Sequence, residues 1–389
     1  MTTAIPAPIS ATRSMPVGLA VVSIPLLFVV LGLAIRYAAF YTGHPGATAA
    51  EFAQGLCRWD CGWYVRIAET GYDPFPVPTM INAGNWAFFP FYPTVIGVLR
   101  LIFVGAPTMV IATVASIIFT WIAVVVAWPL FERNWRAYTL YAAFLLSGPF
   151  SIYFTTFYTE VMFLLLITCV FAALKRQNYL LAGCFAALLS ATRIVGVFIV
   201  FAIVLQAYLD HRAQGGTFKS FLTTIWTRTD LLLGIFIAPL GLFIYMAFLH
   251  YKIGDALAFQ HDQRAWGRVT GSPFGYLWKA LTNFPGSGFI PSASQQLAVG
   301  SIAGIALSIW LGFRKQLPAA VFCGICLVLP LFAGMASMMR FVAGLPPLSI
   351  ELMKLLSRNK VSTVLFLLLF LVLDFEFTLG WLGGALALV

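Results

Sequence analysis

The chain has 389 residues, of which 61% are hydrophobic and only 9% are charged. A water-soluble domain carries about 25% charged residues, so this composition excludes one. The net charge of +10 also does not indicate a nucleic-acid partner, because the basic residues lie in short loops between long apolar runs, as in membrane proteins.

The apolar runs are long enough to cross a membrane as helices. About 20 apolar residues span the roughly 30 Å hydrocarbon core, and every backbone polar group inside it must be paired within its segment, which favours helices. We expect an uncleaved first helix over 16–37. Further spans are expected at 108–131, 137–150, 158–174, 179–192, 194–209, 231–249, 297–313, 317–335, 341–356 and 361–381. The sequence therefore predicts an all-α polytopic membrane protein whose residues 1–389 form a single transmembrane domain.

The positions of the basic residues predict which loops are internal. Cytoplasmic loops carry an excess of Lys and Arg. If Phe88–Val104 crossed the membrane, four basic residues of later loops would lie outside: Arg133, Arg136, Lys175 and Arg176. We therefore expect Phe88–Val104 to be re-entrant or interfacial. Two long external segments follow, at about 42–107 and 250–296.

The first external segment contains a candidate catalytic acid. Trp59, Trp63 and Ile67 recur at helical spacing, which predicts an interfacial helix with its apolar face toward the membrane and Asp60 at its start. Asp60 has two interpretations here, as a helix cap or as a reacting group. Cys57 and Cys61 flank it; a disulfide between them would suit an oxidising compartment, but helical geometry is expected to resist one.

The aromatic block from Phe88 to Pro93 follows in the same segment. It fits an aromatic belt at the headgroup level or a wall that positions a lipid-linked substrate.

Other ionisable residues are expected at the same face. Glu160 and Arg193 lie at the ends of predicted spans, where they form a structural ion pair or serve function. His261–Arg268 lies in the second external segment, and Arg340 lies at another external corner. Arginines gathered at one face suggest binding of a phosphate, with lipid headgroups as the alternative ligand.

In combination, these residues resemble a known family. Trp59-Asp60 with Trp63-Tyr64 looks like the first-loop signature of PIG-V-type mannosyltransferases. Later blocks follow in the family's order: Phe88-Phe89-Pro90-Phe91-Tyr92-Pro93, Tyr158-Thr159-Glu160, Ala191-Thr192-Arg193, Gln263 with Trp266-Gly267-Arg268, and Ser337-Met338-Met339-Arg340. The resemblance covers roughly Arg58 to Pro347. Cys61 departs from the small residue that relatives often have after Trp-Asp.

The resemblance implies a GT-C glycosyltransferase, a multi-span enzyme that uses polyprenyl- or dolichyl-phosphate sugars. We expect inverting transfer of a hexose, with mannose as the leading candidate, to a hydroxyl of an unknown glycan, lipid or protein acceptor. The reaction would occur at the external face of the cell (inner) membrane. Asp60 is the expected base, because the acceptor hydroxyl must lose a proton. A phosphate leaves without a proton if cations meet its charge.

The other residues are expected to bind substrate: Arg58, Trp59, Trp63, Tyr64, Phe89, Tyr92, Tyr158, Glu160, Arg193, Gln263, Trp266, Arg268 and Arg340. Arg193, Arg268 and Arg340 are the candidates for the phosphate. No His/Cys cluster indicates a structural metal; an acid-bound divalent cation is the remaining option. The expected partners are the lipid-linked donor, the acceptor and membrane lipids. The rival interpretation is a transporter or flippase of a lipid-linked sugar, which predicts ionisable groups near the midplane and an internal repeat; neither pattern is visible.

Overall fold

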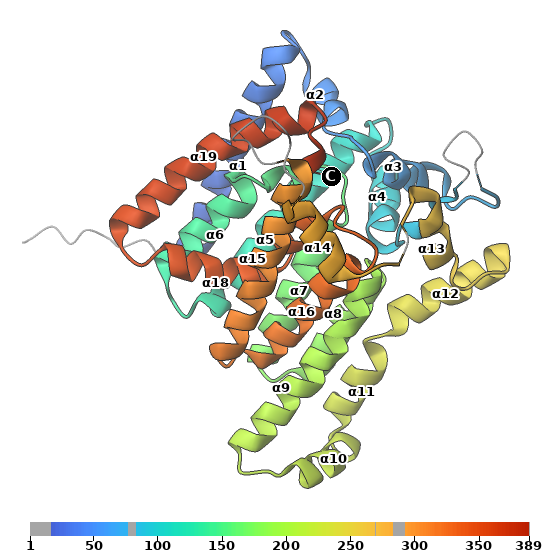
Figure 1. The fold of residues 1–389 in the computed structure, drawn as a ribbon, viewed down its shortest axis with the longest axis vertical. Helices are drawn as coiled ribbons and strands as arrows, with labels where there is room; N and C mark the ends of the chain where they lie inside the picture. Colours follow the sequence, from blue (N-terminus) through green and yellow to red (C-terminus); the bar gives the residue numbers. More distant parts are fainter. Residues whose placement is uncertain (1–16, 77–82, 269, 283–291, 389) are drawn as a thin grey trace, which may run out of the picture.

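The computed structural model describes residues 17–76, 83–268, 270–282 and 292–388, and within them the chain is built of helices (Figure 1). The first half contains α1 (Val17–Gly43), α2 (Ala49–Gly55), α3 (Cys61–Thr70), α4 (Phe91–Ile102), α5 (Thr108–Ala127), α6 (Trp135–Ser147), α7 (Glu160–Lys175) and α8 (Tyr179–Ser190). The middle contains α9 (Ile199–Ala213), α10 (Phe218–Thr227), α11 (Thr229–Ile237), α12 (Leu240–Ile253), α13 (Ala258–His261) and α14 (Pro273–Thr282). The last part contains α15 (Ala293–Phe313), α16 (Leu317–Leu331), α17 (Met338–Ala343), α18 (Pro346–Leu356) and α19 (Lys360–Leu382).

The described residues include 6 helices that are long and apolar enough to cross a membrane: Val17–Gly43, Thr108–Phe131, Ile194–Ala213, Thr229–Ile253, Ala293–Phe313 and Lys360–Leu382. The other predicted spans are also helical but shorter. They correspond to α6, α7, α8, α16 and the pair α17–α18. The prediction of an all-α multi-pass membrane protein is confirmed.

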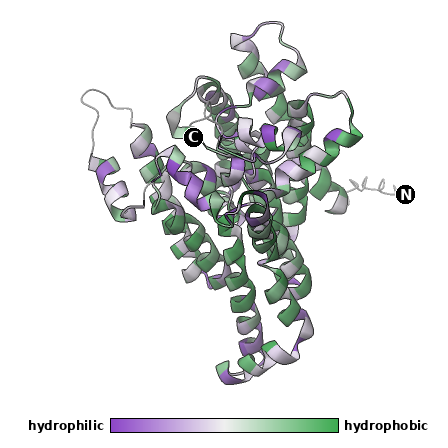
Figure 2. Cartoon of the chain, turned by 90° about the vertical axis from the view of Figure 1, so that its right-hand side faces the viewer, coloured by the Kyte–Doolittle hydropathy of each residue, from purple (hydrophilic) through white to green (hydrophobic). Residues whose placement is uncertain are grey.

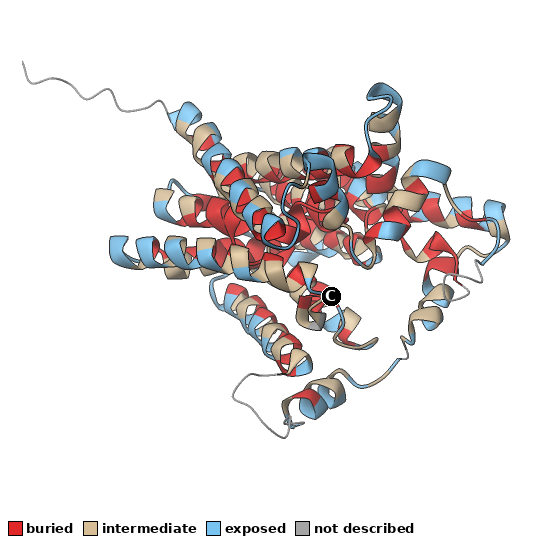
Figure 3. Cartoon of the chain, turned by 90° about the horizontal axis from the view of Figure 1, so that it is seen from above, coloured by how far each residue is buried: buried red, intermediate tan, exposed pale blue. Residues whose placement is uncertain are grey.

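The helices form a bundle whose interior is closely packed. α1 lies against α6 and α19, α5 against α7, and α15 against α16. Buried residues occupy the middle of the bundle, and exposed ones lie on its outer helices (Figure 3). Those outer surfaces are apolar: Leu365, Leu368 and Val372 of α19 are all exposed. Figure 2 shows the same hydrophobic cover on the long helices. Such surfaces are suited to contact with lipid tails.

Two glycines allow α8 and α11 to approach closely. A Cβ atom on Gly183 would lie 2.4 Å from the Cα atom of Gly234. Small residues at helix contacts are typical of membrane bundles, because they bring the backbones together. This contact fixes the pair α11–α12, which leads to the second predicted external segment, onto the bundle.

The predicted span at 341–356 is wrong as a continuous helix. The chain ends α17 at Ala343 and begins α18 at Pro346. Pro346 and Pro347 explain the interruption, since proline cannot donate to the preceding turn and is tolerated only in the first turn of a helix. The break places α17 at the wall of the cavity described below.

α4 supports the prediction for Phe88–Val104. Its 12 residues extend about 18 Å, the same length as α8, so the contacts of its end and not its length distinguish it. Val98, Leu101 and Ile102 are exposed near its end. A short helix with an exposed apolar end fits an interfacial position.

Candidate functional site

A cavity of about 390 Å³ lies where six parts of the chain meet. It is lined from the start of α3, the residues before α4, the start of α7, residues 192–195 after α8, the region around α13, and α16–α17. Nine of the predicted site residues line it: Asp60, Tyr64, Phe89, Glu160, Arg193, Gln263, Trp266, Arg268 and Arg340. The fold thus brings together residues that are far apart in the sequence.

Asp60 is the residue that immediately precedes α3, but it does not cap the helix. Its side chain makes no capping hydrogen bond. Instead, its Oδ2 atom accepts a hydrogen bond from Nη2 of Arg340 at 2.9 Å, and 30% of the Asp60 side chain is exposed. The interpretation of Asp60 as a helix cap is therefore wrong, and the carboxylate faces the cavity.

The turn before Asp60 is held by a disulfide. Cys57 and Cys61 are bonded, with their Cα atoms 5.3 Å apart. The expectation that helical geometry would resist this bond is wrong, because only Cys61 belongs to α3. Trp59 between them adopts a left-handed conformation with φ 44°, which is uncommon outside glycine. The disulfide and this turn together set where Asp60 lies.

The apolar face of α3 is covered by protein, in contrast to the predicted contact with the membrane. Trp63, Tyr64 and Ile67 are all buried. Trp63 stacks on Phe88 at 5.5 Å and meets the edge of Trp266 at 5.6 Å. Trp266 comes from the second predicted external segment, so these rings join the two segments beside the cavity.

Arg340 bridges the two carboxylates of the cavity. Its Nη1 atom lies 3.7 Å from Oε1 of Glu160, while its Nη2 atom holds Asp60. Arg340 also donates to the hydroxyl of Ser337, which precedes α17 in a left-handed conformation with φ 71°. Only 5% of the Arg340 side chain is exposed. The guanidinium is therefore held in place by protein groups on several sides.

Arg193 is also paired. Its Nη1 atom donates to Oε1 of Glu160 at 2.8 Å, which agrees with the predicted structural ion pair. Glu160 begins α7, where a negative charge is favoured by the helix dipole. Its Oε2 atom is buried without a hydrogen-bond partner among the described residues. Glu160 thus holds both Arg193 and Arg340 through one oxygen.

Arg268 differs from the other two cavity arginines. It forms no ion pair within the described part of the chain, although it lines the cavity. Burial lowers the pKa of the Arg268 guanidinium and the nearby carboxylate of Asp60 raises it. Because an arginine remains charged at neutral pH, this side chain offers an uncompensated positive charge to a ligand.

The comparison with solved structures identifies the fold. The chain is similar to the oligosaccharyltransferase of Archaeoglobus fulgidus in the apo form, with a TM-score of 0.50 and 13% identity, over 93% of this chain and 56% of that one. The chain has the GT-C fold. The same oligosaccharyltransferase in complex with Zn and sulfate gives a TM-score of 0.47 and 12% identity, over 92% of this chain and 53% of that one.

The chain therefore spans just over half the length of that oligosaccharyltransferase. No family model matches the sequence, and no curated protein matches it. The likeness at this identity shows the GT-C fold alone. The finer resemblance to PIG-V-type mannosyltransferases stays a prediction.

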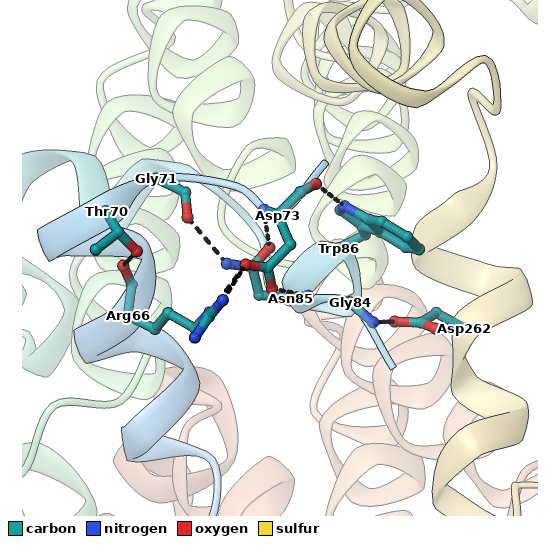
Figure 4. Close-up of polar contacts among 8 residues, drawn as sticks. All are labelled: Arg66, Thr70, Gly71, Asp73, Gly84, Asn85, Trp86 and Asp262. Carbon is teal, nitrogen blue, oxygen red and sulfur yellow. Dashed lines mark hydrogen bonds and ion pairs between the residues drawn. The ribbon is translucent and has the colours of Figure 1, made fainter. Parts of the chain in front are cut away.

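A polar cluster beside the cavity connects the two long segments of this GT-C fold (Figure 4). Asp73 accepts two hydrogen bonds from Arg66, at 2.9 and 2.6 Å, and accepts one from the backbone N–H of Asn85. The backbone N–H of Gly84 donates to Oδ2 of Asp262 at 3.1 Å. Burial raises the pKa of Asp262 to about 6, so this contact weakens as mild acid protonates the carboxylate.

Five predicted substrate-binding residues do not line the cavity. Arg58 donates to the carbonyl of Leu382, and Trp59 packs edge-on against Trp381. Trp63 stacks on Phe88, which itself lines the cavity. Tyr158 donates to the carbonyl of Arg58 at 2.9 Å and lies under the guanidinium of Arg340 at 4.9 Å.

Tyr92 is the clearest of these cases. It is completely buried and its hydroxyl pairs with that of Ser116 at 2.6 Å. In this structure Tyr92 supports the packing of α4 against α5, while Phe88 and Phe89 of the same aromatic block line the cavity.

The sequence did not indicate the apolar part of the cavity wall. Phe163, Ile194, Leu329, Pro330, Ala333 and Phe341 line it. They resemble any other residues of an apolar helix, so their types give no signal. Ser337 is different, because it lies in the block Ser337-Met338-Met339-Arg340 and could have been chosen as the partner of Arg340.

A metal-ligand set is not found among the described residues. No group of three or more His, Cys, Asp or Glu side chains gathers there. The two carboxylates of the cavity are already bridged by the guanidinium of Arg340, which lies where a shared cation would bind.

Proposed function

We propose that the protein is an inverting glycosyltransferase that moves a hexose, with mannose as the first candidate, from a polyprenyl-phosphate donor to an acceptor hydroxyl. One observation carries the proposal: the partly exposed carboxylate of Asp60 lines the same cavity of a GT-C fold as the guanidinium of Arg268, which has no ion-pair partner among the described residues. These are the two charges that such a transfer requires, one for a proton and one for a departing phosphate.

The proposed reaction is a single displacement. Asp60 accepts the proton of the acceptor hydroxyl while the oxygen of that hydroxyl forms the new bond to the anomeric carbon. The bond between that carbon and the phosphate oxygen breaks, and its electron pair leaves with the polyprenyl phosphate. Arg268 stabilises the negative charge that develops there. Attack opposite the leaving group inverts the anomeric carbon.

The remainder of the cavity wall is compatible with a lipid-linked donor. Leu329, Pro330 and Phe341 form an apolar side beside the charged residues. An apolar wall favours a hydrocarbon chain by the hydrophobic effect, and Phe88 and Phe89 offer ring faces to a sugar. The Cys57–Cys61 disulfide favours an oxidising compartment, in keeping with a site on the external face of the cell membrane.

The decisive experiment replaces Asp60 by Asn. Purified protein is incubated with labelled polyprenyl-phosphate mannose and a membrane extract that supplies the acceptor. Asp60→Asn should lower the transfer rate by about 10²-fold or more, because an amide does not accept the proton. The fold should be retained, because the amide oxygen of Asn can still accept the hydrogen bond of Arg340, Glu160 still faces that guanidinium, and the side chain does not cap α3.

Asp255→Asn is the matched control. Asp255 is a half-exposed acid of the second long segment that pairs with His261 at 2.8 Å, away from the cavity. The Asp255→Asn protein should transfer mannose at the wild-type rate. Folded Asp60→Asn protein with activity within a few-fold of wild type would exclude Asp60 as the base.

A further inference from the structure

α10 lies at the far end of the bundle from the cavity (Figures 1 and 2). It connects two membrane-length helices, Ile194–Ala213 and Thr229–Ile253. A ten-residue helix between two such spans extends only about 15 Å and cannot cross the core itself. α10 therefore lies at the membrane surface, opposite the end that carries the cavity.

The apolar residues of α10 point in two directions. Phe221 is buried and contacts the ring of Tyr208 on α9 at 5.3 Å. Phe218, Leu222 and Trp226 follow one another at intervals of one turn and are 62%, 48% and 71% exposed. Residues four apart share a face of a helix. Phe221 attaches α10 to the bundle. Phe218 also meets the ring of Tyr208 edge-on at 5.9 Å, but it remains mostly exposed and forms an apolar stripe with Leu222 and Trp226.

The charges around this stripe are predominantly positive. Arg212 and Lys219 are exposed and form no ion pair within the described residues. The neighbouring acids are already engaged: Asp230 pairs with Arg228 at 2.9 Å, and Asp210 accepts hydrogen bonds from Tyr179 and Gln206. The two unpaired cations are thus available to an anionic partner.

We propose that α10 is a lipid-binding helix. It inserts Phe218, Leu222 and Trp226 into the boundary between headgroups and acyl chains, and Arg212 and Lys219 bind anionic lipid headgroups. An apolar stripe flanked by cations is the pattern of helices that lie in a membrane interface, and cations near an anionic surface strengthen such binding. This inference does not depend on the proposed glycosyltransferase activity.

Spin-label accessibility tests the proposal. Leu222→Cys and Thr223→Cys are prepared in a background where the free Cys169 and Cys184 are Ser; the other free cysteines, Cys323 and Cys326, are buried. Both test positions are exposed, but their side chains point about 100° apart around the helix. The label at each is exposed to oxygen, which concentrates in lipid, and to a water-soluble nickel complex.

In vesicles of phosphatidylcholine, the oxygen-to-nickel collision ratio should be higher at position 222 than at 223. Addition of phosphatidylglycerol should widen this difference, and the double change Arg212→Glu and Lys219→Glu should abolish the widening. Equal ratios at the two positions would overturn membrane insertion. Protection from both reagents at position 222 would indicate a protein partner or a second copy instead. A difference that does not respond to phosphatidylglycerol would overturn the role of the two cations.

Discussion

The three arginines of the cavity differ in the groups that already hold them. Arg193 and Arg340 both pair with Glu160, and Arg340 also pairs with Asp60. Arg268 has no such partner among the described residues. Removing one member of a buried ion pair costs about 3–5 kcal/mol, because the other charge stays buried alone. Changes at Arg340 therefore affect folding as well as activity, whereas changes at Arg268 act mainly on a ligand.

Replacing Arg268 should weaken binding of the donor. We expect Arg268→Ala to raise the KM for polyprenyl-phosphate mannose by about tenfold or more, since a hydrogen bond to a charged group contributes about 1.5–3 kcal/mol. Arg268→Lys should restore only part of the loss, because a point charge lacks the planar fork. Steady-state kinetics measure both. Arg264→Ala, at an exposed arginine of the same turn, is the control; equal KM values in all these proteins would refute donor binding by Arg268.

Arg340 should influence turnover instead. Arg340→Lys keeps one positive charge but cannot bridge Asp60 and Glu160 as a guanidinium does. We expect a lower kcat with a nearly unchanged donor KM, the opposite of the pattern at Arg268. Arg340→Ala should also lower thermal stability, which calorimetry in detergent measures. A raised KM with normal kcat in Arg340→Lys would show that this arginine contacts the donor directly.

The sequence could indicate which residues belong to the site but not how they are paired. Asp60, Arg268 and Arg340 stand out because charges are rare beside apolar runs. The contact between Asp60 and Arg340 joins residues 280 positions apart, and no local sequence pattern predicts a contact at such a separation. Tyr92 shows the converse, since its motif suggested a ligand while its position is in the packed interior.

At the scale of helices, run length and flanking charge predicted the elements well. They were less informative about what covers an apolar face. α3 has the periodicity of an interfacial helix, yet protein covers its apolar side, because α4 and Trp266 reach it through tertiary contacts. Pro346 and Pro347 could have predicted the interruption between α17 and α18, but the continuous hydrophobicity around them favoured a single span.

The close contact of α8 and α11 yields a stability prediction. Gly183→Ala places a methyl group 2.4 Å from backbone atoms of Gly234, so the helices must separate. We expect a loss of about 1–3 kcal/mol, as for other overpacked sites, visible as a lower unfolding temperature in detergent. Gly18→Ala in α1 is the control, because a Cβ atom there meets nothing within 4 Å. Equal unfolding temperatures for the two variants would contradict the close approach.

The orientation of the whole molecule in the membrane can be tested with two exposed lysines. Lys279 of α14 belongs to the predicted external segment, and Lys219 of α10 to an internal loop. In intact cells an impermeant thiol reagent should label Lys279→Cys, while Lys219→Cys should react only after permeabilisation. The reverse pattern would place the cavity on the cytoplasmic side and contradict the topology derived from the charges.

The link between Asp60 and Arg340 also has a consequence for biosynthesis. A ribosome makes the chain from its N-terminus, so α3 is synthesised long before α17 exists. During that interval Asp60 and Glu160 lack the cation that later bridges them. A nascent or prematurely terminated chain that ends before α17 therefore contains Asp60, the proposed base, without Arg340, the arginine that pairs with it. The order of synthesis thus delays completion of the site until α17 has been inserted.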